Sequence, residues 1–406
     1  MNNKTVRSRN RKIFITSETA AGTPDYPAAT DAFLANEVAS FSQETETAEV
    51  DEYTDQLLAV QEVVTGFGYA NPTMTIHPRF GAAVGDLPPE QLLLKNFFGE
   101  CTQTAGTSVK YTFADTDDTL CAWHQYTDVL QQVACGMVVS EMNFTIGKKA
   151  LMAYEFTMMS NQIMNNSQCE IPAGTASIPA GANVMVDVDT QGVYVANVGS
   201  KFDVYDTSGA KVDSDVEVVS TNGTQIEFLS TGVQYDAGFV LKPTLPAGTY
   251  STQVPFAPTK ASVYVGPANE TLANLTTPAN GYAFTTREIS VNMNKNLQTP
   301  TEDELNGSLY GGASYEIDKP RIEISTTLNM LPGTARLYEV AKQDMLRSIA
   351  IEIPHQARKM VVYLPEVFMV VSDGGDNAGA AQQSVTFRNH KSNAVNDAGR
   401  FEFWLY

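Results

Sequence analysis

The sequence predicts a mainly β protein with two similar domains, each carrying one flanking α-helix, and a small all-β module between them. Charged residues make up only 18% of the 406-residue chain and apolar residues 43%, a composition typical of proteins rich in strands and turns. Apolar and polar residues alternate through many short segments. A strand–turn–helix pattern occurs twice, at 71–100 and at 319–346. These three observations together favour an internal duplication.

The strands of the two copies can be aligned on their alternating residues. Met74 and Ile76 align with Ile322 and Ile324, and in both copies polar residues separate the apolar ones, as a half-buried strand requires. The turn that follows contains Leu-Pro in both copies, 244 residues apart, at 87–88 and 331–332. A chance similarity between two meanders that each carry one helix is the alternative.

A helix is expected after each of these turns. In the first copy Asp86 can cap the helix, Pro88 and Pro89 suit its first turn, and Gly99 can end it. In the second copy Thr334 can serve as the cap. The apolar stripes at helical spacing, which we assign to the core, are Leu92, Leu93 and Phe97 in the first helix and Leu337, Val340, Ala341 and Met345 in the second.

The segment between the copies has a different character. Short apolar–polar alternations are separated by turn residues, among them Ser208-Gly209 and Asn222-Gly223, the latter a strong hairpin signal. Pro- and Gly-rich stretches mark its borders. We therefore divide the chain into a first domain at 1–168, an all-β module at 169–255 and a second domain at 256–406.

The charge is large and unevenly distributed. The net charge of −20 should repel nucleic acid, because DNA binding depends on Lys and Arg at the phosphates. The first twelve residues are basic and the segment after them is acidic. The basic arm is either a solvated tail or an element that docks on the acidic loop of a neighbouring subunit. The arm contains Lys4, Arg7, Arg9, Arg11 and Lys12, and the acidic loop contains Glu44, Glu46, Glu49, Asp51, Glu52 and Asp55.

No catalytic constellation is recognisable, and we expect neither an enzyme nor a cofactor. The sequence lacks HExxH, GxSxG and a phosphate-binding glycine loop. Cys121 and His124, with Cys135 downstream, could supply three metal ligands. They lack a fourth ligand at zinc-like spacing, so a buried thiol beside a hydrogen-bonded histidine is the favoured interpretation.

The sequence also bears on the compartment. No segment approaches the about 18 continuous apolar residues of a membrane helix, and the basic N-terminus lacks the apolar run of a signal peptide. We therefore expect synthesis and folding in a cytoplasm. There the four cysteines, Cys101, Cys121, Cys135 and Cys169, should be free thiols.

The order of elements resembles a known family. Each copy is predicted to contain a strand, a long polar loop, a strand, a helix and then paired strands. This order, the opening KIFITSETAAGTPDYPAATDAFLANEVASF (12–41) and the hairpin MVVSEMNFTIGKKALMAYEFTMM (137–159) resemble the tail tube proteins of long-tailed bacteriophages of the siphophage type. The resemblance covers about 1–168 and 256–406. The duplication and the 171–255 module depart from the simplest members.

The resemblance implies a structural virion protein. Two fused tube-like domains of sandwich or barrel type, each with one helix, would make a pseudo-hexameric ring from three chains. Rings would stack into the tail tube, a negatively lined conduit through which double-stranded DNA is ejected without specific binding. The implied partners are further copies of the chain, a tape-measure protein, a tail terminator and a tail-tip or baseplate initiator. Assembly would take place in the host bacterial cytoplasm, without membrane insertion.

The resemblance also implies roles for the charged loops. The acidic loops at about 44–62 and 294–308 correspond in position to family loops that contact the next ring. The basic arm is a second candidate for this contact, and the second loop adds Glu302, Asp303 and Glu304. Two alternatives remain: another virion β protein, such as a tail terminator, baseplate hub or capsid decoration protein, and a surface adhesin or shell protein of immunoglobulin-like modules.

Overall fold

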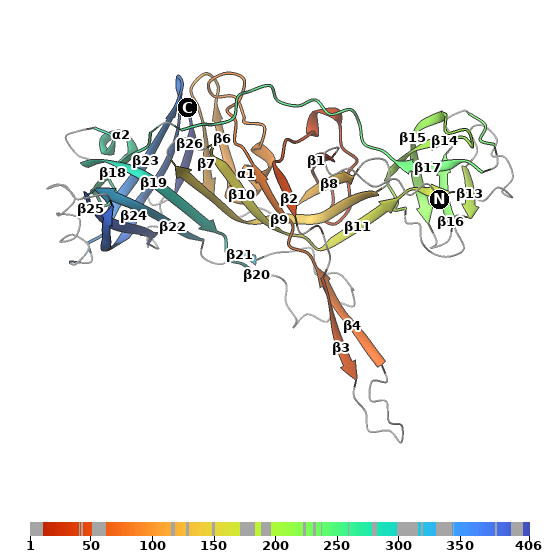
Figure 1. The fold of residues 1–406 in the computed structure, drawn as a ribbon, viewed down its shortest axis with the longest axis horizontal. Helices are drawn as coiled ribbons and strands as arrows, with labels where there is room; N and C mark the ends of the chain where they lie inside the picture. The colour runs from red at the N-terminus through yellow and green to blue at the C-terminus, as the bar shows by residue number, and fades with distance from the viewer. Residues whose placement is uncertain are drawn as a thin grey trace.

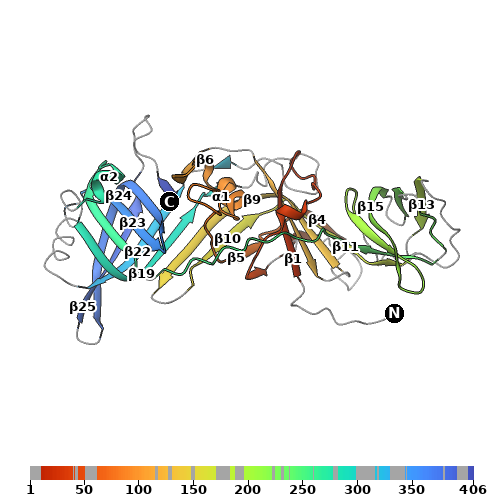
Figure 2. The same ribbon diagram turned by 90° about the horizontal axis from the view of Figure 1, so that it is seen from above.

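The computed structural model describes residues 11–39, 41, 44–50, 62–114, 118–126, 130–147, 151–170, 183–187, 196–221, 225–229, 233–236, 238–258, 260–277, 282–298, 316–317, 320–329, 343, 345–377, 380–390 and 401–406. Antiparallel strands dominate the fold. Three parts lie in a row along the long axis: a second half (262–405) at one end, a first half (11–167) in the centre and a middle module (169–243) at the other end (Figures 1 and 2). The two α-helices of the described residues are too short to cross a membrane.

The described residues of the first half form eleven strands, one 3-10 helix and one α-helix. The 3-10 helix η1 spans Ala29–Asp31 and α1 spans Gln91–Phe98. The strands are β1 Arg11–Ser17, β2 Glu37–Ala39, β3 Glu44–Val50, β4 Glu62–Tyr69, β5 Thr73–Ile76, β6 Gly99–Thr104, β7 Ser108–Phe113, β8 Leu120–Tyr126, β9 Leu130–Gly147, β10 Ala153–Met159 and β11 Gln162–Ser167.

The second half is a closed barrel. Its six strands pair in the order β18–β23–β24–β25–β22–β19, and β19 pairs with β18 to complete the cycle. The short helix α2, Leu272–Leu275, follows the first strand. The strands are β18 Ser262–Pro267, β19 Tyr282–Asn294, β20 Leu297–Gln298, β21 Glu316–Ile317, β22 Arg321–Asn329, β23 Arg347–His355, β24 Arg358–Asn377, β25 Ala380–Asn389 and β26 Glu402–Leu405.

The two halves share one pattern of strand pairing. In the first half the pairs run β1–β8–β9–β10–β5–β2, the same order as the barrel strands of the second half. A further strand pairs beside each long hairpin strand, β11 on β9 and β26 on β24. Where β19 and β18 close the barrel, the first half has an isolated bridge between Phe14 and Ala32. The first half is therefore the more open of two similar units.

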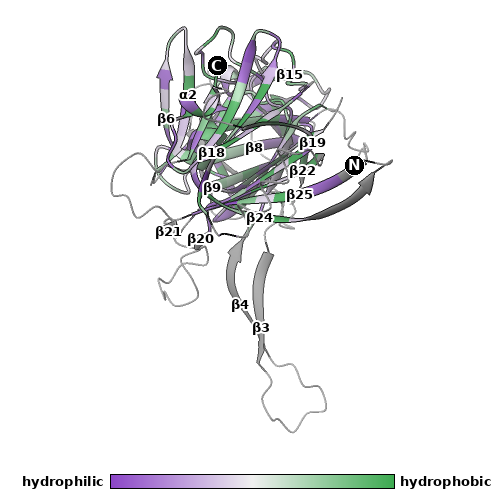
Figure 3. Cartoon of the chain, turned by 90° about the vertical axis from the view of Figure 1, so that its left-hand side faces the viewer, coloured by the Kyte–Doolittle hydropathy of each residue, from purple (hydrophilic) through white to green (hydrophobic). Residues whose placement is uncertain are grey.

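Two strand pairings join the halves into a single 16-stranded sheet. β9 pairs with β19 over Glu141–Gly147 and Glu288–Asn294, and the C-terminal β26 pairs with β7. One hydrophobic core runs through both halves. Figure 3 shows the alternation along the strands as green and purple bands, because successive side chains point to opposite faces of a sheet.

The middle module has its own sheet and core. Its strands pair in the order β12–β17–β14–β15–β16–β13, around buried side chains that include Phe202, Phe228 and Tyr235. The sheet ends at Pro243, and residues 244–256 lie extended along the first half, where Thr249 and Phe256 donate to the carbonyls of Ala29 and Pro78. The strands are β12 Cys169–Glu170, β13 Asn183–Asp187, β14 Lys201–Tyr205, β15 Lys211–Thr221, β16 Gln225–Leu229 and β17 Val240–Pro243.

The helix after the first turn differs in one detail from the sequence prediction. Asp86 does not cap α1; its carboxylate accepts from the backbone of Ala83, in a turn that precedes the helix. Residue Glu90 holds the cap position, and the helix ends at Gly99 as predicted, with φ of 89°. The residues of the second predicted helix lie almost entirely outside the described part of the chain.

Candidate assembly surface

One face of the continuous sheet is mostly polar across both halves, with the exposed Phe368 and Val370 of β24 as apolar exceptions. A row of directly opposed residues crosses β2, β5, β10, β9, β19, β22, β25 and β24 in this order, with the core on the other face. The sheet therefore presents one uninterrupted surface, eight strands wide. The row consists of Glu37, Thr75, Glu155, Asn143, Asn292, Glu323, Arg388 and Phe368.

The charges on this surface are mostly acidic. Both of its described arginines, Arg321 and Arg388, form ion pairs with Glu323, at 3.2 and 3.0 Å. Within the described part of the chain, the other acids of the surface form no ion pair. These acids are Glu37, Glu141, Glu155 and Glu288.

At the junction between the halves the sheet keeps one apolar face and one polar face. Ile146 and Ile289 oppose each other on the core side and are 5% and 0% exposed. On the polar side the amide of Asn294 donates to Glu141 at 2.6 Å. The junction is thus a complete antiparallel strand pair, with apolar contacts on one face and hydrogen bonds on the other.

The acidic loop of the first half forms a projecting hairpin. β3 and β4 pair with each other and extend away from the body beyond β2 and β5 (Figure 1). Glu44, Glu46 and Glu49 lie in β3; the other predicted acids of this loop, Asp51, Glu52 and Asp55, lie outside the described residues. At the corresponding place in the second half, β20 pairs with β21. Glu302, Asp303 and Glu304, between these two strands, are outside the described residues.

The end of the basic arm belongs to the sheet. Arg11 and Lys12 begin β1, with the Arg11 guanidinium 4.8 Å from the ring of Tyr126 and the Lys12 ammonium donating to the carbonyl of Leu245. These two residues therefore contact their own chain. Lys4, Arg7 and Arg9 lie outside the described residues.

The middle module is fixed to the first half by a buried polar network. The amide of Asn166, which is fully buried, donates to Gln131 at 2.7 Å and to Ser200 at 2.8 Å. Its carbonyl oxygen accepts from the backbone of Asn197, and Gln131 donates to the carbonyl of Thr244. Because each buried polar group has a partner, the network orients the module relative to β9 and β11.

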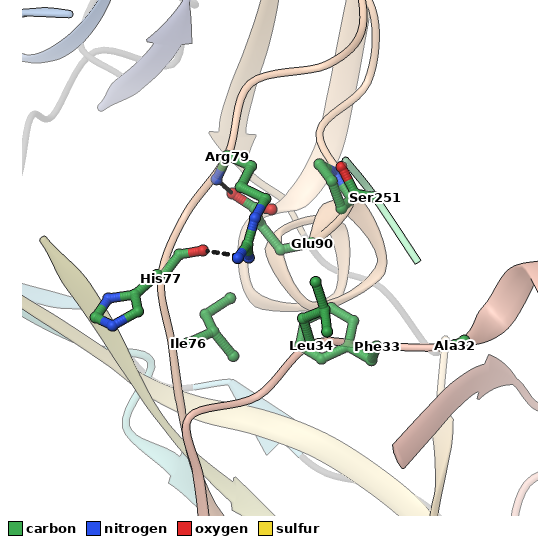
Figure 4. Close-up of a pocket in the computed structure, with 9 residues that line it drawn as sticks. Ala32, Phe33, Leu34, Ile76, His77, Arg79, Glu90 and Ser251 are labelled. Carbon is green, nitrogen blue, oxygen red and sulfur yellow. Dashed lines mark hydrogen bonds between the residues drawn. The ribbon is translucent and has the colours of Figure 1, made fainter. Parts of the chain in front are cut away.

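A small cavity beside the N-terminal end of α1 is lined by His77, Arg79 and Glu90 (Figure 4). Burial raises the pKa of Glu90 to about 8, although the backbone N–H of Arg79 donates to its carboxylate and the charge of Arg79 opposes the shift. The Arg79 guanidinium donates to the carbonyls of His77 and Gln253. The cavity measures about 20 Å³, room for about one water molecule. These contacts anchor the extended segment that follows the module.

Cys121 and Cys135 meet across β8 and β9, with their sulfur atoms 3.9 Å apart. Together with the carboxylate of Glu18 they could hold a metal ion, because the three ligand atoms lie within 4.8 Å of one another. His124, which the sequence groups with them, points to the opposite face of β8, where it contacts Phe41. The expectation of a hydrogen-bonded histidine is wrong, because neither ring nitrogen has a hydrogen-bond partner among the described residues. Burial and the nearby Arg11 lower the pKa of His124 to about 4. All four cysteines are free thiols.

Comparisons with known proteins add no assignment. No protein-family model matches the chain, and no curated protein is significantly similar to it. Sequence reasoning found the acidic loop and the core strands of the polar surface, but it missed the strand pairing between the halves. The similar hairpins at 137–159 and 357–389 could have indicated this pairing, because two similar long hairpins have similar strand edges available for pairing.

Proposed function

We propose that the chain is a tail tube protein of a long-tailed bacteriophage, a structural virion protein whose rings stack into the conduit for DNA. Each chain contributes two tube domains, so three chains form one pseudo-hexameric ring. The middle module decorates the outside of the tube. The chain acts without a cofactor or a catalytic centre, and its partners are further copies of itself, a tape-measure protein, a tail terminator and a tail-tip initiator.

The register across the sheet carries this proposal. The bulges of β8–β9 and β23–β24 occupy the same place in the two halves, and matching them aligns β1 with β18. The residues that pair with these two strands then correspond as well, so Phe33 is the counterpart of Phe284. Counting four residues onward makes Glu37 the counterpart of Glu288. The row that starts at Glu37 crosses the four strands of the first half and arrives at Asn292. Asn292 lies four residues beyond Glu288, so the sheet shifts by four residues over four strands.

A stagger of this kind is what a closed tube of strands requires. One residue per strand, at about 3.3 Å per residue and about 4.8 Å between strands, gives a strand tilt of roughly 35°. This tilt agrees with the 35–45° that is usual in closed barrels. Eight strands per chain and three chains give a wall of 24 strands with a backbone radius of about 22 Å. Such a tube is wide enough for a DNA duplex.

The polar surface is the proposed lumen wall. It carries four acids that form no ion pair within the described part of the chain: Glu37, Glu141, Glu155 and Glu288. DNA phosphates would meet like charge and find few cations to bind, so the duplex could slide. The projecting β3–β4 hairpin and the loop between β20 and β21 are the proposed contacts to the next ring, a head-to-tail contact that generates an open filament.

Sedimentation of the purified protein over a range of protein and salt concentrations tests the proposal. A species of three chains, and larger species in multiples of three, are expected. A chain that stays monomeric at every concentration, and also after purified tail tips are added as nuclei, would contradict it. Another virion β protein, such as a tail terminator, is the second candidate, because a single ring that never stacks would fit the same edges and the same acidic surface.

A further inference from the structure

The junction between the two halves can be used to locate the contact between neighbouring chains. Within the chain, the far end of β9 pairs with β19, and Gly147 opposes Glu288 there. By strand pairing, β24 is the counterpart of β9 and β2 is the counterpart of β19. If the sheet continues around a ring, the far end of β24 must meet β2 of the next chain.

Both counterpart edges are unpaired in the described part of the chain. β24 pairs with β23 only as far as Val367, and from Phe368 to Asn377 its one described partner is β25. β2 pairs on one side with β5 and with no described strand on the other. Unpaired strand edges invite the addition of a further strand.

The first half also has a groove at the corresponding place. In the second half, the end of β9 lies against Glu288 and Ile289, next to the β18–β19 pair. In the first half the same position is a groove of about 550 Å³ along the free edge of β2. Leu34, one of the lining residues, is 39% exposed. The groove is lined by Arg11, Ile13, Phe33, Leu34, Ala35, Asn36, Glu37, Val38 and Tyr250.

Charge favours the same occupant. Arg11 lines the groove, and the end of β24 reads Ser-Asp-Gly-Gly-Asp-Asn at 372–377. Asp373 and Asp376 give this segment negative charge, and Arg11 is the one base among the lining residues of the groove, which also include the acid Glu37. Attraction between opposite charges at an interface guides the partner into register.

We propose that the end of β24 of one chain pairs antiparallel with β2 of the next and completes the ring. This inference rests on the proposed function. The register follows from the β9–β19 pair: Gly147 opposite Glu288 becomes Asn377 opposite Glu37, and Ile146 opposite Ile289 becomes Asp376 opposite Val38. Arg11 then belongs to the contact within a ring, while the rest of the basic arm remains a candidate for the contact between rings.

Engineered disulfides test both the partner and the register. In a Cys101→Ser background, which removes the one cysteine that is not buried, Glu37→Cys with Asn377→Cys should form an intermolecular disulfide under mild oxidation. A non-reducing gel should show dimers and a circular trimer that disappear on reduction. Glu37→Cys with Val219→Cys, an exposed position of the middle module, is the control and should remain uncross-linked.

A third variant distinguishes registers. Phe368 ends the row that begins at Glu37, so Glu37→Cys with Phe368→Cys should cross-link only in a ring without stagger. Cross-linking of that pair in place of the Asn377 pair would overturn the inference. Rings that assemble with no cross-link through Asn377 would overturn the inference and leave the proposed function standing. A protein that forms no rings at all would contradict both.

Discussion

The ammonium group of Lys295 donates a hydrogen bond to the backbone carbonyl of Asn96, 199 residues earlier in the chain. Lys295 follows β19 in the second half and is 1% exposed, and Asn96 lies in the last turn of α1 in the first half. A cation at the C-terminal end of a helix satisfies a carbonyl that has no partner within the helix. The side chain of Asn96 accepts from the backbone of Val139 and donates to the carbonyl of Asp118. The two halves are therefore coupled through the end of α1.

Replacing Lys295 by Met should destabilise the protein by about 1–3 kcal/mol, because the carbonyl of Asn96 would lose this buried donor while the apolar stem of the side chain is kept. The shift in thermal or urea unfolding measures the effect. Lys260→Met, at an exposed position, is the control and should change stability by less than about 0.5 kcal/mol. Equal effects of the two substitutions would contradict a role for the Lys295–Asn96 contact.

Replacing Gly99 by Ala should be far more damaging than replacing Gly22. Both glycines have positive φ, 89° and 77°, a backbone conformation in which alanine is strained. At Gly99 a Cβ atom would also overlap the carbonyl of Ala114, which is held close because its N–H donates to Phe98. At Gly22 the space is open. Unfolding curves of the two variants measure the difference in stability, and similar curves would refute the proposed overlap at Gly99.

Glu90 should make the protein less stable as pH rises. Burial raises its pKa in the folded protein from 4.5 to about 8, so the folded state binds this proton more tightly than the unfolded state does. The resulting stability is fully present below about pH 4.5 and is lost as pH rises through about 8. Glu90→Gln removes the titration. Thermal unfolding between pH 5 and 9 should decline less steeply in this variant, and an unchanged slope would show that Glu90 is not the responsible group.

The outer part of the basic arm should strengthen stacking. Arg7→Ala with Arg9→Ala should weaken polymerisation and reduce its dependence on salt, because attraction between the arm and acidic loops of a neighbour is screened by ions. Turbidity or sedimentation at increasing salt provides the measurement. Lys260→Ala, which removes an exposed charge elsewhere, is the control. Unchanged assembly of the double variant would exclude the arm from the contact.

The sequence predicted the β class, the first helix and the presence of a middle sheet, because these depend on local periodicity and turn residues. The residue-by-residue alignment of the two copies, however, was wrong. We aligned Met74 with Ile322, but the strand registers place Met74 opposite Val38 and Thr326 opposite the counterpart residue Ile289, so Met74 corresponds to Thr326. A strand alternates with period two, and its pattern cannot distinguish registers that differ by an even number of residues.

The candidate surface was less predictable than the elements. Lys295 is buried although a lone lysine in a loop normally faces water, because the end of α1 supplies its acceptor. The correspondence between residues of the two halves depends on bulges in β8–β9 and β23–β24, which have no sequence signature here. The acidic hairpin was recognised from composition alone, because a cluster of acidic residues is visible in the sequence without knowledge of the strand pairing.

Electron microscopy of the purified protein, alone and with purified tail tips as nuclei, tests the central claim most directly. The account predicts hollow tubes or stacked rings whose class averages have three-fold symmetry and six lobes, with the middle module as a further density on the outside. Compact monomers under all of these conditions, or rings without an open centre, would contradict it.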